Sequence, residues 1–265
     1  MKQILKVLGL VALALLIAPQ ANATIILTDS NSTVLIDPAS QDGMYDWKLD
    51  GIDVMYQQWF WFRVGNTAEH SIDTIGTPVI LQATPNIVQL TYGAGGPLEI
   101  QILYALTGGM AGSLTSDVAE TIHIINRSTQ ALDLHFYQYS DFDLSASDIV
   151  TIDHSLRFVD QVPAGGGTVL SETVATPSPD HAEANYFSNT RNALNDGLPT
   201  TLNGVLKAGP GDMTWAFEWD QVIAAHGSLI ISKDKHLAPV PEPAALALFG
   251  GILVLLSRKL RRAGA

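Results

Sequence analysis

The central part of the chain alternates between short runs of β-type residues and tight turns, and this pattern constrains the fold more than any other feature. Between Thr24 and Lys235, runs rich in valine, isoleucine, threonine and aromatic residues are separated by glycine, proline, asparagine and aspartate. Asp50 and Gly51 between two such runs are a strong hairpin signal. Only residues 188–195 have the pattern of a short helix. The sequence therefore predicts an all-β ectodomain, either a β-sandwich or a jelly-roll-like fold.

The first 23 residues have the order of a secretory signal peptide. Lys2 and Lys6 precede an apolar run over residues 7–18, and Ala21 and Ala23 supply the small-residue ending at which signal peptidase cuts. A buried or membrane helix is the alternative, but the run is short for a membrane span and the alanine pattern favours cleavage. The sequence therefore predicts an N-terminal signal helix that export removes after Ala23.

The end of the chain combines a proline triplet, an apolar run and a basic cluster. Pro241-Glu242-Pro243 is held extended by its two prolines, and the apolar segment 244–256 follows directly. As a helix this segment would measure about 20 Å, against about 30 Å of membrane hydrocarbon. We expect a single short C-terminal transmembrane helix whose end stays in the cytoplasm, where positive charge is retained. The basic stop-transfer cluster consists of Arg258, Lys259, Arg261 and Arg262.

These three parts, in this order, resemble the PEP-CTERM sorting signal, over about the last 25 residues. The resemblance implies that an exosortase, a membrane-embedded cysteine transpeptidase-like enzyme, recognises Pro241, Glu242 and Pro243 and cleaves nearby. It also implies an exported bacterial protein that is anchored in the inner membrane until processing and then reaches the cell surface or an exopolysaccharide matrix. A plain C-terminal anchor is the alternative. The chain divides into the signal peptide 1–23, the ectodomain 24–235, and a linker with the sorting tail over 236–265.

Charge and cysteine content exclude several functions. The whole chain has a net charge of −12, and basic residues gather at its two ends, so the ectodomain between them is more acidic still. Such a surface repels phosphate backbones, which argues against nucleic-acid binding, and it attracts cations or basic polymers. The absence of cysteine excludes disulfides, cysteine nucleophiles and thiolate metal sites.

One segment carries oxygen ligands at alternating positions. Asp141, Asp143 and Ser145 stand at every second residue, with Asp148 nearby, which is how a calcium-binding loop begins. The segment departs from an EF-hand because Ala146 occupies the position that requires glycine. Two interpretations remain: a looser Ca²⁺ site at these four residues, or a polar strand exit whose carboxylates cap local amides. No other cofactor is expected.

Two histidines suggest a second and weaker metal hypothesis. If residues 120–125 and 132–139 form a hairpin, His123 faces Asp133 on the neighbouring strand, and His135 lies two residues along on the same face. Two histidines and a carboxylate can hold a metal, but the set lacks a third histidine or a known zinc spacing. The alternative interpretation is the polar outer face of a half-buried hairpin.

Two further strands carry rows of aromatic residues. Residues 59–62 place aromatics on both faces, as expected of a central strand that is covered on both sides. A row of exposed indoles would stack on sugar rings, but buried aromatics dominate sandwich interiors, so core packing is the favoured interpretation. The second row consists of Trp215, Phe217 and Trp219, with Ala216, Glu218 and Asp220 on the opposite face.

No motif in the sequence identifies an enzyme. There is no Gly-x-Ser-x-Gly elbow, no P-loop and no Gly-x-Gly-x-x-Gly fingerprint. We therefore expect a non-enzymatic cell-surface or matrix protein that binds glycans or cations weakly. The alternative is a secreted carbohydrate-active hydrolase on the same fold, because a glycosidase needs only two carboxylates at a set distance and the chain has 26 acidic residues.

Replacing Pro241, Glu242 and Pro243 by alanine tests the sorting interpretation. We expect mature wild-type protein to lack the segment from Ala244 onward and the variant to stay full-length in the inner membrane. The physical reason is that insertion depends on the apolar run and its basic end and hardly on the triplet. Mass spectrometry of C-terminal peptides separates the two outcomes. Residues 255–262 intact on surface-exposed wild-type protein would contradict sorting and leave a plain anchor.

Overall fold

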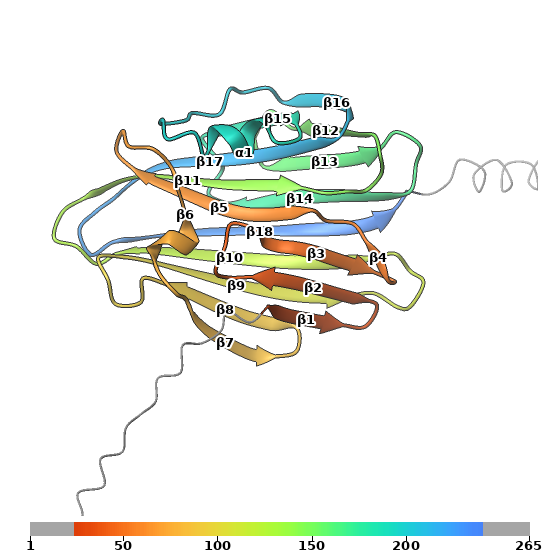
Figure 1. Ribbon diagram of the computed structural model, residues 1–265, viewed down its shortest axis with the longest axis horizontal. Coiled ribbons are helices and arrows are strands. Elements are labelled where there is room, and N and C mark those ends of the chain that lie inside the picture. Colours follow the sequence, from red (N-terminus) through yellow and green to blue (C-terminus); the bar gives the residue numbers. More distant parts are fainter. Residues whose placement is uncertain (1–23, 241–265) are drawn as a thin grey trace, which may run out of the picture.

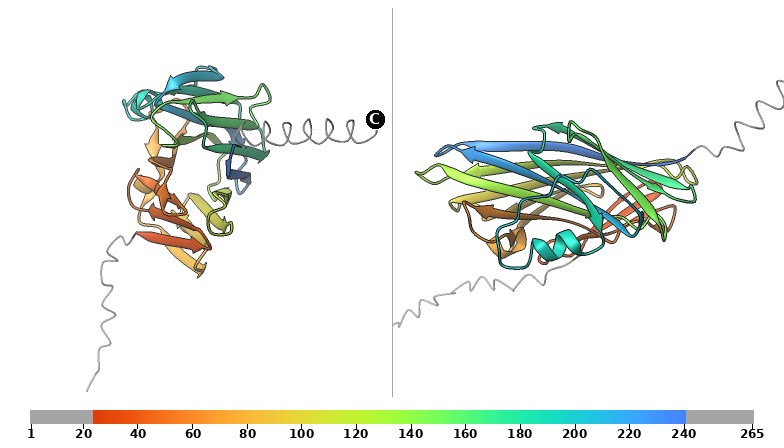
Figure 2. Two further views of the ribbon diagram at one scale, coloured as in Figure 1. Left: turned by 90° about the vertical axis from the view of Figure 1, so that its right-hand side faces the viewer. Right: turned by 90° about the horizontal axis from the view of Figure 1, so that it is seen from above.

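The computed structural model describes residues 24–240, which fold into two sheets packed face to face (Figure 1). The end view in Figure 2 shows the two layers. The predicted all-β sandwich is therefore confirmed. The expected cleavage residues Ala21 and Ala23, the triplet 241–243, the apolar segment 244–256 and the basic end 258–262 lie outside the described residues.

Sheet A contains nine strands and is antiparallel except where β3 meets β5. Its main path runs through β1 (Ile25–Asp29), β2 (Ser32–Asp37), β3 (Gly43–Leu49), β5 (Gln57–Val64), β11 (Leu132–Asp141), β17 (Met213–Ile223) and β15 (His181–Tyr186). Two short strands lie off this path: β4 (Ile52–Asp53) pairs with β3, and β6 (His70–Ser71) pairs with β5.

Sheet B also contains nine strands, all antiparallel to their neighbours. In spatial order they are β16 (Lys207–Gly211), β12 (Asp148–Ile152), β13 (Phe158–Pro163), β14 (Thr168–Thr176), β18 (Ser228–Pro239), β10 (Ser116–Asn126), β9 (Leu98–Gly108), β8 (Ile87–Tyr92) and β7 (Val79–Thr84). The helical elements described are η1 (Ile72–Ile75) and α1 (Asn189–Ala193), and α1 confirms the short helix predicted over 188–195.

The predicted Asp50-Gly51 hairpin is present between β3 and β4. Leu49 pairs with Ile52, and the two turn residues have φ angles of 51° and 84°. A two-residue turn with both φ angles positive matches the right-handed twist of the strands, and this explains why aspartate and glycine stand there.

The last strand extends beyond the expected end of the domain. β18 continues through Pro239, pairing with β14 as far as Thr168, and the Val240 amide donates to the Gly167 carbonyl. Residues 236–239, expected to be part of a linker, therefore belong to sheet B.

Aromatic residues fill both sides of the central strands, as predicted. In β5, Trp59, Phe60 and Trp61 are fully buried, and so are Trp215 and Trp219 in β17. The outer face of β5 is covered because the segment that carries α1 lies over it (Figure 2), and the Trp61 indole donates to Asn195 at 3.3 Å. Core packing is thus the role of both aromatic rows.

A fully buried ionic cluster joins the two sheets. Lys233 and Lys235 of β18 both contact Glu120 of β10, and each ammonium lies 3.4 Å or less from Glu172 of β14. From sheet A, the Gln138 amide and the Trp215 indole donate to Glu172 at 2.9 and 3.0 Å. Burial raises the pKa of Glu172, but Lys235 and Lys233 outweigh it and hold this pKa below its usual value.

The cluster is balanced in charge, and its geometry explains why burial is tolerated. Two ammonium groups face two carboxylates, so each charge taken out of water has a partner in the low-dielectric interior. The Lys233 ammonium also lies 5.3 Å from the centre of the Phe60 ring, which adds a cation–π contact between the sheets.

No helix among residues 24–240 is long and apolar enough to cross a membrane.

Lys233→Met should destabilise the fold by about 3–5 kcal/mol, because it leaves a buried carboxylate without its partner. The double variant Lys233→Met/Glu120→Met should recover part of that loss, since Lys235 and Glu172 remain as a balanced pair. Urea unfolding measures both. Lys207→Met, which removes an exposed lysine, is the matched control and should change the midpoint little. A Lys233→Met midpoint equal to wild type would contradict the role of the cluster.

Candidate functional site

The outer face of sheet A carries the polar side chains of β11 and β17. Successive residues of a strand point to opposite faces, so Phe136 and Gln138 face sheet B while His135 and Tyr137 face outward. The same alternation places the aromatic row of β17 in the core and turns its acidic residues outward. One sequence thus supplies a core face and a polar face in each strand.

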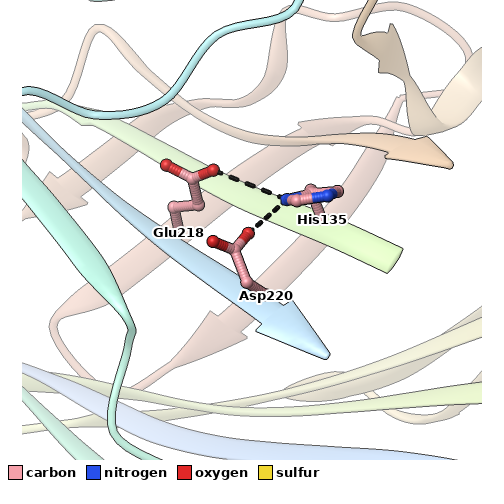
Figure 3. Close-up of side chains that lie close together, drawn as sticks. All are labelled: His135, Glu218 and Asp220. Atoms are coloured by element: carbon pink, nitrogen blue, oxygen red, sulfur yellow. Dashed lines mark hydrogen bonds and ion pairs between the residues drawn. The ribbon is translucent and has the colours of Figure 1, made fainter. Parts of the chain in front are cut away.

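Strand register brings the polar residues together. His135 pairs with Asp220, and Tyr137 pairs with Glu218, in the antiparallel ladder between β11 and β17. On the other side of β11, Arg63 of β5 pairs with His135. The result is a group on the outer face of sheet A formed by His135, Glu218 and Asp220 (Figure 3).

An imidazole lies between two carboxylates in this group. His135 Nδ1 is hydrogen-bonded to Asp220 Oδ1 and lies 3.8 Å from Glu218 Oε1 (Figure 3). The other oxygen of Asp220 lies 3.3 Å from His181 Nε2, on β15. His135 Nε2 lies 3.9 Å from an oxygen of Asp133. The side chain of His135 is 16% exposed and that of Asp220 is 29% exposed, so solvent and solutes reach them.

Glu218 lies beneath the histidine and is fully buried. Its Oε2 accepts from the Leu202 amide at 2.8 Å, and its Oε1 lies 2.9 Å from the Tyr137 hydroxyl. That hydroxyl donates to the Thr200 carbonyl at 2.7 Å and accepts from Arg63 Nε at 2.9 Å. The same hydroxyl is the donor in its contact with Glu218, and Arg63 Nη2 lies 3.8 Å from Glu218 Oε1.

The surroundings of Glu218 shift its pKa upward. Burial raises the pKa of Glu218 to about 7. The hydrogen bond from the Leu202 amide lowers this pKa, and the charge of Asp220 raises it. A carboxyl group with a pKa near neutrality, next to an imidazole, can hold or release a proton under physiological conditions. The arrangement can therefore perform general acid–base chemistry.

The same three residues are also ligand types that bind zinc. However, His135 and Asp220 are hydrogen-bonded to each other, and both oxygens of Glu218 have partners. The geometry therefore favours proton transfer over metal binding at this position.

The site is an open patch of the sheet face. Two surface hollows of the described residues lie elsewhere, one beside Gly108 and Met110 and the other between Phe62 and the turn over residues 93–98. His135, Glu218 and Asp220 line neither of them.

The structure separates the four residues of the predicted calcium loop into two groups. Asp141 and Asp143 come together with Asp212, a residue that the sequence did not suggest. Ser145 instead donates to Asp148 Oδ1 at 2.6 Å, and the other oxygen of Asp148 accepts from Gln161 at 2.7 Å. Asp148 is thus held by local hydrogen bonds.

The predicted hairpin of the two histidines is wrong. β10 belongs to sheet B and pairs with β9 and β18, whereas β11 belongs to sheet A. His123 faces Gln101 and Ile230, and it has no part in the site of His135. The turn between these strands crosses from one sheet to the other, a connection that a short turn sequence does not distinguish from a hairpin.

Glu218 and Asp220 were missed as site residues. Their strand drew attention for its aromatic face, and the acidic residues on the alternate face were the only available signal. Their partner His135 is 85 residues away from Asp220 along the chain, so nothing local links them.

The sequence matches no protein-family model and none of the curated protein sequences. Solved structures share the fold. A protein of Escherichia coli K12, provisionally assigned as an aldose 1-epimerase, is 8% identical with a TM-score of 0.57, covering 82% of this chain and 98% of its own. A GalM/aldose epimerase homologue from C. elegans is 8% identical with a TM-score of 0.51, covering 83% and 100%.

A bacterial glucoamylase, solved in complex with acarbose, shares the same sandwich. It is 9% identical with a TM-score of 0.59, and the match covers 84% of this chain but 34% of the glucoamylase. This chain therefore spans about a third of that enzyme. At these identities the likeness establishes the fold.

These neighbours correct the expectation of a non-enzymatic surface or matrix protein. The match covers almost the whole of two of these neighbours, and both carry epimerase assignments. The glucoamylase is also a sugar-processing enzyme. The finding favours the alternative, a carbohydrate-active enzyme. That expectation relied on the absence of sequence motifs, which does not exclude a site assembled from strands far apart in the sequence.

Protonation of Glu218 should make stability depend on pH. The folded protein holds a proton that unfolded Glu218 would release above pH 4.5, so stability should fall as pH rises from about 5 to about 7. Thermal unfolding of Glu218→Gln should show a weaker fall over this range than wild type. Burial also raises the pKa of Asp141 to about 7, and this residue contributes equally to the pH dependence of both proteins.

The control variant is Glu99→Gln. In the wild type, the hydrogen bond from Arg127 lowers the pKa of Glu99 to about 2. The contribution of Glu99 to stability therefore changes below pH 4.5 and is constant between pH 5 and 7. Identical pH profiles for wild type and Glu218→Gln would show that Glu218 is ionised throughout, contrary to expectation.

Proposed function

We propose that this chain is a carbohydrate-active enzyme that transfers protons at the anomeric centre of a sugar, interconverting its anomers. The observation that carries the proposal is the partly exposed imidazole of His135, held between Asp220 and Glu218 on the outer face of sheet A. The epimerase assignments of proteins with this fold support it.

Each residue has a chemical role in this reaction. Anomer interconversion removes the proton of the anomeric hydroxyl, protonates the ring oxygen, opens the ring and closes it again on the other face. Asp220 accepts a hydrogen bond from the Nδ1–H group of His135. This hydrogen bond leaves Nε2 free to take or give a proton toward solvent. His181, on the second oxygen of Asp220, supplies a further imidazole at the same surface.

Proton transfer agrees with the geometry better than covalent hydrolysis does. A retaining glycosidase needs an accessible carboxylate that attacks the anomeric carbon. Glu218 is buried and both of its oxygens are occupied, so it is not available as a nucleophile. It serves instead as a proton reservoir beneath His135.

His135→Asn and Asp220→Asn test the proposal. Each should reduce the rate of α-to-β interconversion of glucose or galactose by about 10²–10⁴-fold, because general acid–base catalysis contributes about that much. Polarimetry or NMR exchange measures the rate. The same proteins are assayed for release of p-nitrophenol from nitrophenyl glycosides, which reports hydrolysis.

The control is His236→Asn. His236 forms an exposed pair with Asp117 at 2.7 Å on sheet B, which matches the His–Asp pair of the site in chemistry but not in position. This variant should keep the full rate. Loss of activity in the control, or equal activity in wild type and both site variants, would refute the assignment; hydrolysis without interconversion would replace it with a glycosidase.

We also propose that the chain is exported by signal peptidase processing and sorted by an exosortase-like protease to the cell surface. The order of charged, apolar and small residues over 1–23 supports export, and the triplet Pro241, Glu242 and Pro243 before an apolar run supports sorting. The end of β18 at Pro239 leaves the triplet directly after the folded domain. An enzyme delivered there would meet extracellular sugars or exopolysaccharide.

A further inference from the structure

A second polar cluster lies at the other end of the ladder between β11 and β17. The ladder between β11 and β17 ends where Asp141 pairs with Thr214, and Asp143 and Asp212 each lie two residues from this pair along the chain. One oxygen from each of the three aspartates lies within 4.8 Å of the other two. Asp141 is buried, whereas Asp143 and Asp212 are exposed, so the cluster has a closed floor and an open side.

The buried carboxylate of this cluster has an oxygen without a partner. Asp141 is 1% exposed, and its Oδ2 accepts from the Tyr139 hydroxyl at 3.0 Å. Its Oδ1 has no hydrogen-bond partner among the described residues. Leaving a charged oxygen buried and unpaired costs more than almost any other local defect. A cation bound by Asp141 and the two neighbouring carboxylates would offset this cost.

No protein cation fills this role among residues 24–240. Arg191 is the nearby basic residue, but its guanidinium donates to Gln57 at 2.9 Å and lies 5.3 Å from the centre of the Phe187 ring. It forms no ion pair with the three aspartates. Three carboxylates thus converge with an excess of negative charge.

We propose that Asp141, Asp143 and Asp212 bind a divalent cation, Ca²⁺ by the chemistry of the ligands. Oxygen-only ligand sets suit hard cations, and an open side that admits several waters suits the six to eight ligands of Ca²⁺. The ligand set differs from the contiguous loop that the sequence suggested, because Asp212 replaces Ser145 and Asp148.

The position of the cluster defines what the cation does. Asp143 lies in the connection that leaves β11 of sheet A for β12 of sheet B, and Asp212 lies in the connection that returns from β16 to β17. A cation bound here links two crossovers between the sheets. It stabilises the end of the sandwich opposite to His135 and takes no part in the proposed proton transfer.

Thermal unfolding of the protein after removal of metal with EDTA tests this site. Addition of about 10 mM CaCl₂, about 10 to 100 times the Kd of extracellular calcium modules, should raise the wild-type Tm by about 3–10 °C. NaCl at equal ionic strength should give a much smaller change. Calorimetric titration with CaCl₂ should show one binding event per chain.

Variants distinguish the ligand sets. Asp212→Asn and Asp143→Asn, both at exposed positions, should lose the calcium-dependent shift, whereas Ser145→Ala should keep it. Circular dichroism without calcium confirms that each variant is folded. An equal shift with NaCl, no shift in wild type, or a shift retained in Asp212→Asn and lost in Ser145→Ala would each overturn the proposal. Because sugar interconversion is measured separately, failure of one proposal leaves the other standing.

Discussion

The rest of the structure depends on the buried ionic cluster between the sheets. Lys233 and Lys235 neutralise Glu120 and Glu172 at fully buried positions, and Gln138 and Trp215 bring sheet A into the same network. Apolar contacts alone do not fix how two sheets face each other, because they are non-directional. Charged groups that must find their partners select one alignment, and the polar outer face of sheet A follows from it.

That outer face is organised by one ladder. The register between β11 and β17 sets His135 opposite Asp220 near one end, and Asp143 and Asp212 lie close together just beyond the other end. In between, the covering segment with α1 and residues 194–206 buries the ladder and closes over Glu218. Burial raises the pKa of Glu218, and the partly exposed residues at the two ends are those at which we propose that a sugar and a cation bind.

A sandwich of this kind separates stability from chemistry. The faces between the sheets carry aromatic residues and the ionic cluster, and the partly exposed His135 and Asp220 lie on the outer face of sheet A. The outer face can therefore change without loss of the fold, which explains how epimerase-type proteins and part of a glucoamylase share this architecture at 8–9% identity. Function here must be argued from His135 and its neighbours.

The sequence by itself determined the all-β class, the Asp50-Gly51 hairpin, the short helix at 189–193 and the burial of both aromatic rows, because turn chemistry and two-residue alternation are local. Only the tertiary structure decided that β10 and β11 lie in different sheets, and that His135 meets Asp220 across 85 residues. It likewise assigned Asp212 to the aspartate cluster. Such pairings depend on which strands are neighbours, and hydrogen bonds between backbones are the same for every partner, so register and sheet order emerge only when the whole core is packed.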